Sequence, residues 1–400
     1  MRAVILAAGE GKRMYPLTGT RSKVMMPIAN KPIMEHLLLE IREAGIRDFL
    51  IVVGYHGERI RDYFRDGSPW GANIEYVSQR KQLGTADAVR QILPQINEPF
   101  LLANGDVIIG RDDVRKLTEQ SNITVALSSM DNVSGLGVVE VEDSTIIRIH
   151  EKVEKPPTNI VNTGVYLLNP EALLAIDETH PSPRGEYELT HTLQLLIDLH
   201  VPVLGHMADS WLNFTYPWDL LDANESVITN MEPAMLGEVE EGAVLKGMVS
   251  AGKGTIVRSG SYVVGPVIIG DDCEIGPNCY IRAATAIGDK CHIGNAVEVK
   301  NSIIMKETRI PHHNYVGDSV VGERCNLGAG TKIANLRLDR ENIRALGINT
   351  SRKKLGALVG DGVQVGINAS INVGAAIGHD STIGPGAVVN GTVLPGSEIM

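Results

Sequence analysis

The sequence predicts two folds in succession: a doubly wound α/β sheet over the first half of the chain and a parallel β-helix over the second. Short apolar runs alternate with amphipathic stretches up to about residue 230, which is the pattern of strands and helices in a doubly wound sheet. From residue 239 an aliphatic residue recurs every six positions. This spacing is typical of a parallel β-helix, because each hexapeptide forms one side of a coil and directs one side chain inward.

Length and charge limit the classes of function. The 400 residues are enough for two or three domains with their own cores. We expect domains at residues 1–229 and 238–400, joined by a linker at 230–237. The net charge of −11 argues against a nucleic-acid partner. No long apolar segment is visible near the N-terminus, so we expect a cytoplasmic protein without a signal peptide or membrane span.

The first half supplies the elements of the sheet in order. The apolar runs predict strands at residues 3–6, 49–53, 74–77 and 100–103, and amphipathic stretches predict helices at 33–44, 58–64, 86–93 and 113–119. A further helix is expected at 217–229. The sheet is expected to be mostly parallel, and ligands bind such sheets beyond the carboxyl ends of the strands.

A glycine-rich stretch follows the first strand. It holds Gly9 and Gly11, with Arg13 and Lys23 after them. Glycine lets the backbone approach a phosphate closely, and two cations suit a triphosphate. Gly-x-Gly after a strand is equally typical of an ordinary turn, and this one lacks both the third glycine of a dinucleotide fingerprint and the Gly-Lys-Ser/Thr of a Walker loop.

Two further polar features lie at the same expected edge. Asp106 follows a strand and offers the oxygen ligand that Mg²⁺ prefers, although a turn or helix-cap aspartate is the alternative. Gln82, Gly84 and Thr85 open a helix and could face a nucleotide base, or could simply cap the helix.

Polar residues also bracket an expected strand pair. Glu151 and Lys152 precede Asn162 in the sequence, and their side chains suit the hydroxyl groups of a sugar. An ordinary surface hairpin is the competing interpretation.

Taken in order, seven signatures of the first 225 residues resemble the sugar-1-phosphate nucleotidylyltransferases. They are LAAGEGKRM, SKVMMPI with KPI, QLGTADA, NGD, GLGVVE, EK with VNTGVY, and SWLNFTYPWDLL. The resemblance implies a nucleotide-diphospho-sugar transferase-like fold. It also implies nucleotidyl transfer from UTP or dTTP to a sugar 1-phosphate (N-acetylglucosamine 1-phosphate or glucose 1-phosphate), with release of pyrophosphate.

The resemblance also implies roles for individual residues. Leu6, Gly9 and Gly11 would hold the nucleotide with Gln82, Gly84 and Thr85; Arg13 and Lys23 would be catalytic; Gly137, Glu151, Lys152 and Asn162 would bind the sugar phosphate; and Asp106 and Asn213 would bind Mg²⁺. The sugar phosphate is already an anionic nucleophile. The cations and Mg²⁺ are therefore expected to act by reducing the repulsion between two polyanions.

The second half is organised by its repeat. The aliphatic column occupies every sixth position from 239 to 299, from 321 to 333 and from 359 to 389. The next residue is often Gly or Asn, which we interpret as a turn in the left-handed backbone region. Each of the four cysteines lies two positions before an aliphatic residue. They are therefore predicted to fill the core rather than to form disulfides or bind zinc.

The repeat is interrupted twice, and both interruptions are expected to be insertions. They cover residues 301–319, which include His312, and the basic stretch 337–358. Arg282 and Lys300 also stand where turns elsewhere prefer glycine. Basic groups and a histidine at these places are compatible with an anionic ligand and proton transfer, and equally with two solvated loops.

The segments IRAATAIG, GNAVEVK, PHHNYVGDSVVG, NLGAGT and IAN are similar to the acetyltransferase half of bifunctional uridylyltransferase/glucosamine-1-phosphate acetyltransferases. The similarity implies a left-handed β-helix, a homotrimer or dimer of trimers, and acetyl-CoA as co-substrate for N-acetylation of glucosamine or galactosamine 1-phosphate. His312 would take the proton of the sugar amine, and His313 would be a spectator. The substrate would be held by Arg282, Lys300, Tyr315, Asn326, Asn335 and Lys354.

Two alternatives remain open at this point. The β-helix could serve only trimerisation or regulation in a monofunctional nucleotidylyltransferase. The whole chain could also be a non-catalytic scaffold, like the related subunits of translation exchange factors.

Overall fold

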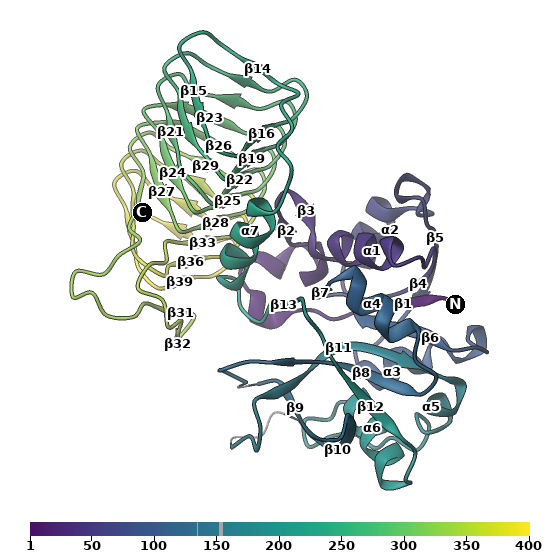
Figure 1. Ribbon diagram of the computed structural model, residues 1–400. Helices are drawn as coiled ribbons and strands as arrows, with labels where there is room; N and C mark the ends of the chain where they lie inside the picture. The colour runs from purple at the N-terminus through teal and green to yellow at the C-terminus, as the bar shows by residue number, and fades with distance from the viewer. Residues whose placement is uncertain (134, 152–154) are drawn as a thin grey trace. The chain divides into compact units, whose positions relative to one another are not determined.

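The computed structural model describes residues 1–133, 135–151 and 155–400, and Figure 1 shows their helices and strands. The contacts divide the chain into two units. The first comprises Met1–Glu10, Ser22–Met25 and Ile33–Asn213; the second comprises Gly11–Arg21, Met26–Pro32 and Phe214–Met400. The second unit therefore includes two short segments from near the N-terminus. The domain boundaries expected from the sequence stay a prediction.

The first unit is built on a nine-stranded sheet. In sheet order its strands are β5 (Asn73–Ser78), β4 (Asp48–Val53), β1 (Ala3–Ala7), β6 (Phe100–Asn104), β11 (Ile160–Leu168), β8 (Ile123–Ser129), β12 (Val203–Met207), β10 (Thr145–Glu151) and β9 (Gly137–Glu142). The first four are parallel to one another, whereas β11 runs antiparallel to β6 and β8. The expectation of a mostly parallel sheet is thus right for these four strands and for β8 with β12, which also pair in parallel, whereas β9, β10 and β11 form antiparallel pairs. Two residues join β9 to β10, and so short a connection allows only antiparallel pairing.

Helices cover both faces of this sheet, as a doubly wound fold requires. Alternate residues of β1 enter two different cores. Ala3 and Ile5 pack on the face covered by α1 (Ile33–Glu43), α2 (Gly57–Phe64) and α4 (Arg111–Thr118). Val4 and Leu6 face α3 (Thr85–Arg90), α5 (Pro170–Leu174) and α6 (Leu189–Asp198). A two-stranded ribbon joins β7 (Val107–Ile109) to β13 (Trp211–Asn213).

The second unit begins its C-terminal part with α7 (Asp219–Thr229) and continues into three parallel sheets (Figure 1). Side one consists of β14 (Glu238–Val239), β17 (Ile256–Val257), β20 (Glu274–Ile275), β23 (His292–Asn295), β26 (Arg309–His312), β29 (Asn326–Leu327), β34 (Gln364–Val365), β37 (Thr382–Ile383) and β40 (Glu398–Ile399). Side two consists of β15 (Val244–Lys246), β18 (Tyr262–Val264), β21 (Tyr280–Ile281), β24 (Glu298–Lys300), β27 (Tyr315–Gly317), β30 (Lys332–Ile333), β35 (Ser370–Ile371) and β38 (Val388–Val389). Side three consists of β16 (Val249–Ala251), β19 (Val267–Ile269), β22 (Thr285–Ile287), β25 (Ile303–Ile304), β28 (Val320–Val321), β33 (Leu358–Val359), β36 (Ala376–Ile377) and β39 (Thr392–Val393).

The chain visits the three sides in turn, which is the path of a parallel β-helix. The predicted aliphatic column lines its core, with exposed fractions of 3% or less from Ala251 onward. Val239 is 38% exposed, because no coil precedes it. The four cysteines are free and buried in the same core, as predicted, and burial raises the pKa of the Cys273 thiol to about 11.

The glycine column has a different cause from the predicted one. Gly270, Gly288 and Gly366 do not adopt positive φ; the left-handed residues lie two positions further on, as at Asp272 and Lys290. A Cβ at these glycines would instead overlap the next coil, for example 2.7 Å from the backbone nitrogen of Lys306 at Gly288. Close stacking of the coils therefore requires these three glycines, and the prediction of a left-handed turn is wrong for them. Gly276 of the same column does have a positive φ, of +102°.

The first expected insertion is a shortened coil. Val257 pairs with Ile275, 18 positions on, but Ile287 pairs with Ile304, only 17 positions on. Residues 301–319 thus stay within the stack, and the loss of one residue at a corner mimics an insertion in the sequence. The second interruption is a true insertion, since Val321 pairs with Val359. It carries the hairpin of β31 (Arg344–Ala345) and β32 (Ile348–Asn349).

Within the described ranges, we find no helix with the length and apolar character needed to cross a membrane.

Candidate active sites

Parallel strands β1, β4 and β6 end at one edge of the first unit, where the sequence predicts the nucleotide. A Cβ at Gly54, just after β4, would lie 2.7 Å from the carbonyl oxygen of Ala8 and 2.8 Å from Nε2 of Gln82. Gln82 therefore lies against the ends of β1 and β4. Leu6 belongs to the same edge, because its carbonyl oxygen accepts a 2.8 Å hydrogen bond from the backbone of Gly105.

The start of α3 is fixed by a segment far away in the sequence. Gly84 has a φ of +118°, and a Cβ there would overlap the carbonyl oxygen of Tyr187. The Thr85 hydroxyl accepts a 2.9 Å hydrogen bond from the backbone of Leu189. Buried Gln79, which the sequence analysis missed, donates to the Gly84 carbonyl at 3.1 Å. These contacts hold Gly84 and Thr85 close to Gln82 in one rigid turn.

A lysine and an aspartate meet beyond the end of β6. Nζ of Lys23 lies 2.5 Å from Oδ2 of Asp106, and their side chains are 13% and 34% exposed. Asn213 pairs with Val107, the residue after Asp106, through β13 and β7. The oxygens of Asp106 and Asn213 are the hard ligands that Mg²⁺ prefers. The described residues hold no group of three or more His, Cys, Asp or Glu suited to a metal, so Mg²⁺ here would complete its shell with phosphates and water.

The predicted sugar-binding residues gather on β9, β10 and β11. A Cβ at Gly137 would lie 3.0 Å from Oε2 of Glu151 and 3.9 Å from Cβ of Asn162. The Thr190 hydroxyl donates to Glu151 at 3.1 Å, and an Arg184 nitrogen lies 3.4 Å from the same carboxylate. Thr190 and Arg184 were missed, because nothing in the local sequence links them to Glu151. Lys152 lies outside the described residues.

The remaining phosphate residues are divided between the units. Gly9 belongs to the first unit, and a Cβ there would meet no described atom within 4 Å. Gly11 and Arg13 belong to the second unit. Gly11 has a φ of +69° and precedes a short 3-10 helix, Lys12–Met14, on which Arg13 is exposed.

In the β-helix, three of the predicted acetyltransferase residues, Lys300, Tyr315 and Asn335, meet at the corner after side two. Nζ of Lys300 lies 3.2 Å from Asp318, which also accepts hydrogen bonds from Asn301 at 2.7 Å and Asn335 at 2.5 Å. The Tyr315 hydroxyl accepts from Asn335 at 3.1 Å. Asp318 is 3% exposed and joins the cluster, yet the sequence analysis missed it. Asp318 ends the segment PHHNYVGD, which also contains His312 and Tyr315, and this position was the signal in the sequence that could have identified it as a site residue.

The shortened coils explain why these residues meet. The inward-pointing residues on either side of this corner are five positions apart at Val299 and Ile304 and at Val316 and Val321, whereas Val263 and Ile269 on an earlier coil are six apart. Asn301 and Asp318, the first residues after β24 and β27, both have positive φ, so the two corners stack one above the other. The next coil leaves the stack after Ile333 for the long insertion, and Asn335 is at its start.

Arg282 lies on the preceding coil of side two. It donates a 2.9 Å hydrogen bond to Glu298, a partner that the sequence analysis missed. This bond is the largest cause of the raised pKa of Arg282. Glu298 in turn pairs with Tyr315 across β24 and β27. Arg282, Lys300, Tyr315 and Asn335 therefore share one face of the coil.

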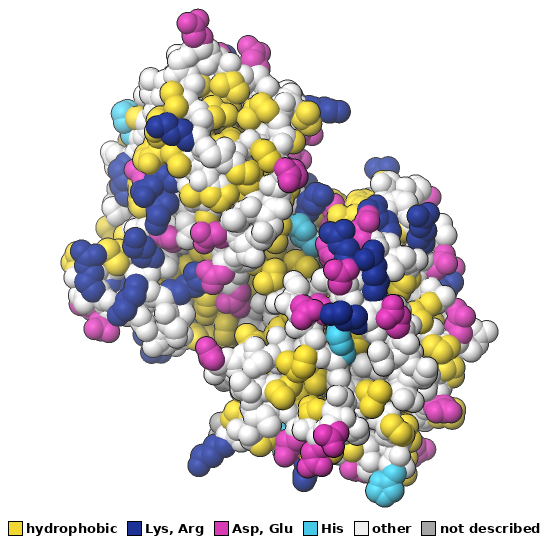
Figure 2. Space-filling model, viewed as in Figure 1, with side chains coloured by type: hydrophobic (Ala, Val, Ile, Leu, Met, Phe, Trp, Pro, Cys, Tyr) yellow, Lys and Arg dark blue, Asp and Glu magenta, His cyan; other side chains and the backbone are white. Residues whose placement is uncertain are grey.

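His312 and Asn326 lie on side one instead. His312 ends β26 at the corner before Tyr315, and Asn326 begins β29, where it pairs with Arg309. Lys354 returns to the cluster from the insertion, since the next residue, Leu355, donates to the carbonyl of Asn335 at 3.1 Å. Figure 2 shows many Lys and Arg side chains over the insertion that carries β31 and β32. Its sequence supplies Arg337, Arg340, Arg344, Arg352, Lys353 and Lys354.

Comparisons with known proteins agree with this geometry. Residues 2–230 match the family model described as Nucleotidyl transferase, and residues 263–366 match one described as GMPPB C-terminal domain. A Bifunctional protein GlmU of Methanococcus maripaludis strain C7 is 40% identical over 100% of this chain and 97% of its own. A bifunctional sugar-1-phosphate nucleotidylyltransferase/acetyltransferase of Sulfurisphaera tokodaii is 37% identical over 98% and 97%.

The chain belongs to the family of bifunctional sugar-1-phosphate nucleotidylyltransferases/acetyltransferases. The solved structure of a UDP-glucose pyrophosphorylase complexed with UDP-glucose confirms the nucleotidyltransferase-like fold of the first unit: its TM-score is 0.52, at 23% identity over 57% of this chain and 99% of that one. Membership of this family accounts for two separate clusters of predicted site residues in one chain.

Proposed function

We propose that the first unit transfers a nucleotidyl group from UTP or dTTP to a sugar 1-phosphate, with N-acetylglucosamine 1-phosphate and glucose 1-phosphate as the candidate acceptors. The observation that carries this proposal is the 2.5 Å pair of Lys23 and Asp106 beyond the end of β6. A cation beside a partly exposed carboxylate, near the glutamine at the ends of β1 and β4, is suited to a triphosphate and its metal.

The mechanism follows from charge. A phosphate oxygen of the sugar attacks the α-phosphorus of the triphosphate, and pyrophosphate leaves. The attacking oxygen is already anionic, so no side chain needs to remove a proton. Arg13, Lys23 and Lys152 would hold the two anions together and stabilise the leaving group. Asp106 and Asn213 would hold Mg²⁺, which when bound supplies further neutralisation of the phosphates.

Pyrophosphate release tests this proposal. The purified protein is incubated with Mg²⁺, each of the common nucleoside triphosphates and each candidate sugar 1-phosphate. We expect release with UTP or dTTP and one or both sugars. Release with no pair in the panel would reject nucleotidyl transfer. Omission of Mg²⁺ should abolish the reaction.

A second activity is proposed for the β-helix: N-acetylation of glucosamine 1-phosphate or galactosamine 1-phosphate by acetyl-CoA. The cluster of Lys300, Tyr315 and Asn335 around Asp318 supports it, because a rigid group of cation and amide donors suits a sugar phosphate. The amine nitrogen would attack the thioester carbonyl, the CoA thiolate would leave, and His312 would accept the amine proton.

Release of free CoA tests the second activity. We expect release from acetyl-CoA with one of the two amino-sugar phosphates, giving after nucleotidyl transfer a UDP-GlcNAc-type product. Pyrophosphate release without CoA release would favour the monofunctional alternative, and neither activity would favour the scaffold. The proposal includes a left-handed coil and a homotrimer or dimer of trimers, and light scattering measures the latter.

A further inference from the structure

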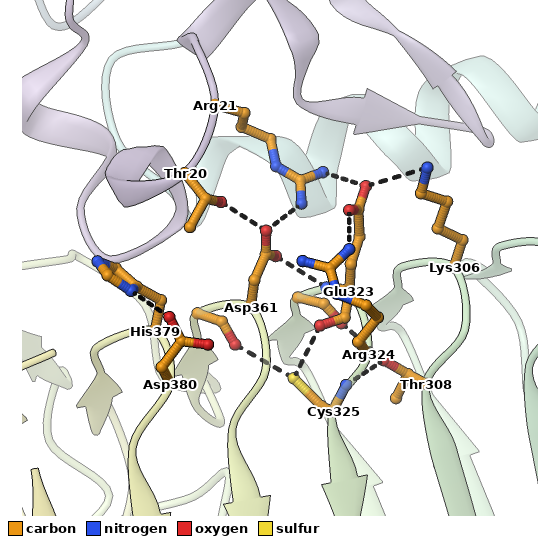
Figure 3. Close-up of polar contacts among 12 residues, drawn as sticks. Thr20, Arg21, Lys306, Thr308, Glu323, Arg324, Cys325, Asp361, His379 and Asp380 are labelled. Atoms are coloured by element: carbon orange, nitrogen blue, oxygen red, sulfur yellow. Dashed lines mark hydrogen bonds and ion pairs between the residues drawn. The ribbon is translucent and has the colours of Figure 1, made fainter. Parts of the chain in front are cut away.

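The segment that carries Arg13 is anchored to the β-helix. Gly11–Arg21 is grouped with the second unit by its contacts, although Glu10 before it and Ser22 after it belong to the first. Two side chains near its end, Thr20 and Arg21, contact carboxylates at the corner after side three (Figure 3). The conformation of this segment therefore depends on the coils of the β-helix.

Arg21 is the centre of this anchor. Its side chain is 4% exposed; Nη2 lies 2.5 Å from Oδ2 of Asp361, and Nη1 lies 2.8 Å from Oε1 of Glu323. Thr20 donates to the same Asp361 oxygen at 2.5 Å. Figure 3 shows the guanidinium spanning the two carboxylates, which come from successive coils. Burial lowers the pKa of Arg21, but the two carboxylates outweigh it, so the guanidinium stays charged.

The rest of the segment follows the same corner along the stack. A Cβ at Gly19 would overlap the ring of His379, which is one coil beyond Asp361. The Tyr15 hydroxyl donates to the carbonyl of Val393, one coil further, at 3.3 Å. Contacts on successive coils fix residues 15–21, which include a 3-10 helix at Leu17–Gly19, and Arg13 is two residues before this stretch.

A comparison within the β-helix shows that the anchor is specific. Asp289 occupies the same corner position on an earlier coil, and its Oδ1 accepts the backbone N–H of Asp271 at 2.8 Å. Oδ1 of Asp361 accepts the backbone N–H of Glu323 at the same distance. Asp289 is exposed, whereas Asp361 is 3% exposed. Both aspartates hold neighbouring coils together, and Asp361 additionally binds Thr20 and Arg21.

We propose that Arg21 is a positioning residue for nucleotidyl transfer, acting through Asp361 and Glu323 to hold the segment that presents Arg13 and leads into Lys23. This inference rests on the proposed function of Arg13 and Lys23. It explains why an arginine, whose guanidinium can bind two carboxylates at once, stands two residues before Lys23.

Asp361→Asn and Arg21→Lys test the proposal, with Asp289→Asn as the matched control. Asp361→Asn removes one of the two negative charges that Arg21 faces and keeps the size of the side chain. Arg21→Lys keeps the charge and loses the two-pronged geometry. Each protein is assayed for pyrophosphate release and CoA release well below its melting temperature, with KM measured separately for the triphosphate and the sugar 1-phosphate.

We expect both anchor variants to lose about 10²-fold in kcat/KM for the triphosphate, because a displacement of about 1 Å of a catalytic group costs that much. The KM for the sugar 1-phosphate and the rate of CoA release should stay within about twofold, since Glu151 and Lys300 belong to other clusters. Asp289→Asn should leave both activities unchanged. Rates of pyrophosphate release that are unchanged, or that fall in step with CoA release, would overturn the inference.

The outcome separates this inference from the proposed function. A wild-type protein that releases no pyrophosphate rejects the proposed function and the inference with it. An active wild type whose anchor variants match Asp289→Asn rejects the inference alone. If Arg21→Lys fails to fold, Asp361→Asn decides, because it leaves no buried carboxylate without a partner.

Discussion

The two predicted sites both contain a lysine–aspartate pair. The pairs differ in the exposure of the aspartate and in the number of hydrogen bonds that its carboxylate accepts. Asp106 is 34% exposed and is hydrogen bonded to Lys23, at the ends of elements distant in the sequence. Asp318 is 3% exposed and accepts from Lys300, Asn301 and Asn335 on a repeating scaffold. An open carboxylate can take a metal or release its lysine to a phosphate, whereas a saturated one orients its donors. The predictions below test this difference.

The largest effect is expected at His312. His312→Ala should lower the rate of CoA release by about 10²- to 10⁴-fold, because general-base catalysis is worth that much. Pyrophosphate release should be unchanged. His313→Ala is the matched control, since His313 is adjacent and exposed and has no expected role. Equal losses in the two variants would show that the corner, rather than the imidazole of His312, matters.

Lys23→Ala should have the next largest effect. Loss of one preorganised charge commonly costs about 3 kcal/mol in the barrier, or about 10²-fold in rate. Pyrophosphate release should fall by this factor, and CoA release should not change. Lys116→Ala is the control, because Lys116 forms a surface ion pair with Asp209. Near-normal pyrophosphate release in Lys23→Ala would contradict the role of the open pair.

Asp318→Asn should affect stability as well as acetyl transfer. The amide cannot satisfy three donors, and Lys300 loses its partner, so we expect the free energy of unfolding to fall by about 1–3 kcal/mol. Denaturant unfolding measures this change. Glu240→Gln, at the exposed pair with Arg258, should change the free energy by less than about 1 kcal/mol. If the free energy of unfolding falls by the same amount in the two variants, Asp318 does not hold its cluster together.

The smallest effect concerns pH. Burial raises the pKa of Asp361, but the Arg21 charge and the hydrogen bonds from Thr20, Arg21 and the Glu323 backbone outweigh it, so the pKa lies below its ordinary value. Its stabilising contribution is therefore complete above the unfolded-state pKa of about 3.9 and is lost as pH falls through the lower folded-state pKa.

The melting temperatures of wild type and Asp361→Asn, compared between pH 7 and pH 3, measure this contribution. The advantage of the wild type should be constant above about pH 5 and shrink below pH 4. Glu323 also faces Arg21 and is itself paired with Lys306 and Arg324, and it is present in both proteins. If the difference in melting temperature between wild type and Asp361→Asn grew as the pH fell, the lowered pKa of Asp361 would be contradicted.

Regular features were predictable from the sequence. The strands β1, β4, β5 and β6 were expected within one or two residues. Strands β1, β4 and β6 are buried apolar runs, whereas β5 is a half-exposed edge strand in which only Ile74 is buried. The β-helix core followed from the six-residue column. Both patterns depend only on which side chains avoid water, and a local sequence shows that directly.

The features missed from the sequence depend on contacts between distant residues. Asp318 and Arg21 look like ordinary surface residues, and only folding brings their partners from other coils. The glycines were assigned to turns, although their cause is the coil above them. The shortened coils were read as an insertion, because a single missing residue breaks the apparent period. The six-residue period thus predicts the regular coils of the β-helix well, but it does not predict the structure at the positions where the period is interrupted.

The shortened coils carry a consequence for how this chain can evolve. The residue missing from each of the two coils that reach Ile304 and Val321 falls at one corner, so these two side chains still point inward and the strands that follow keep their partners. A deletion inside a strand would instead turn every following side chain outward. Corners are therefore the places where a repetitive scaffold tolerates gains and losses of length, and new chemistry can arise there without rebuilding the rest of the molecule.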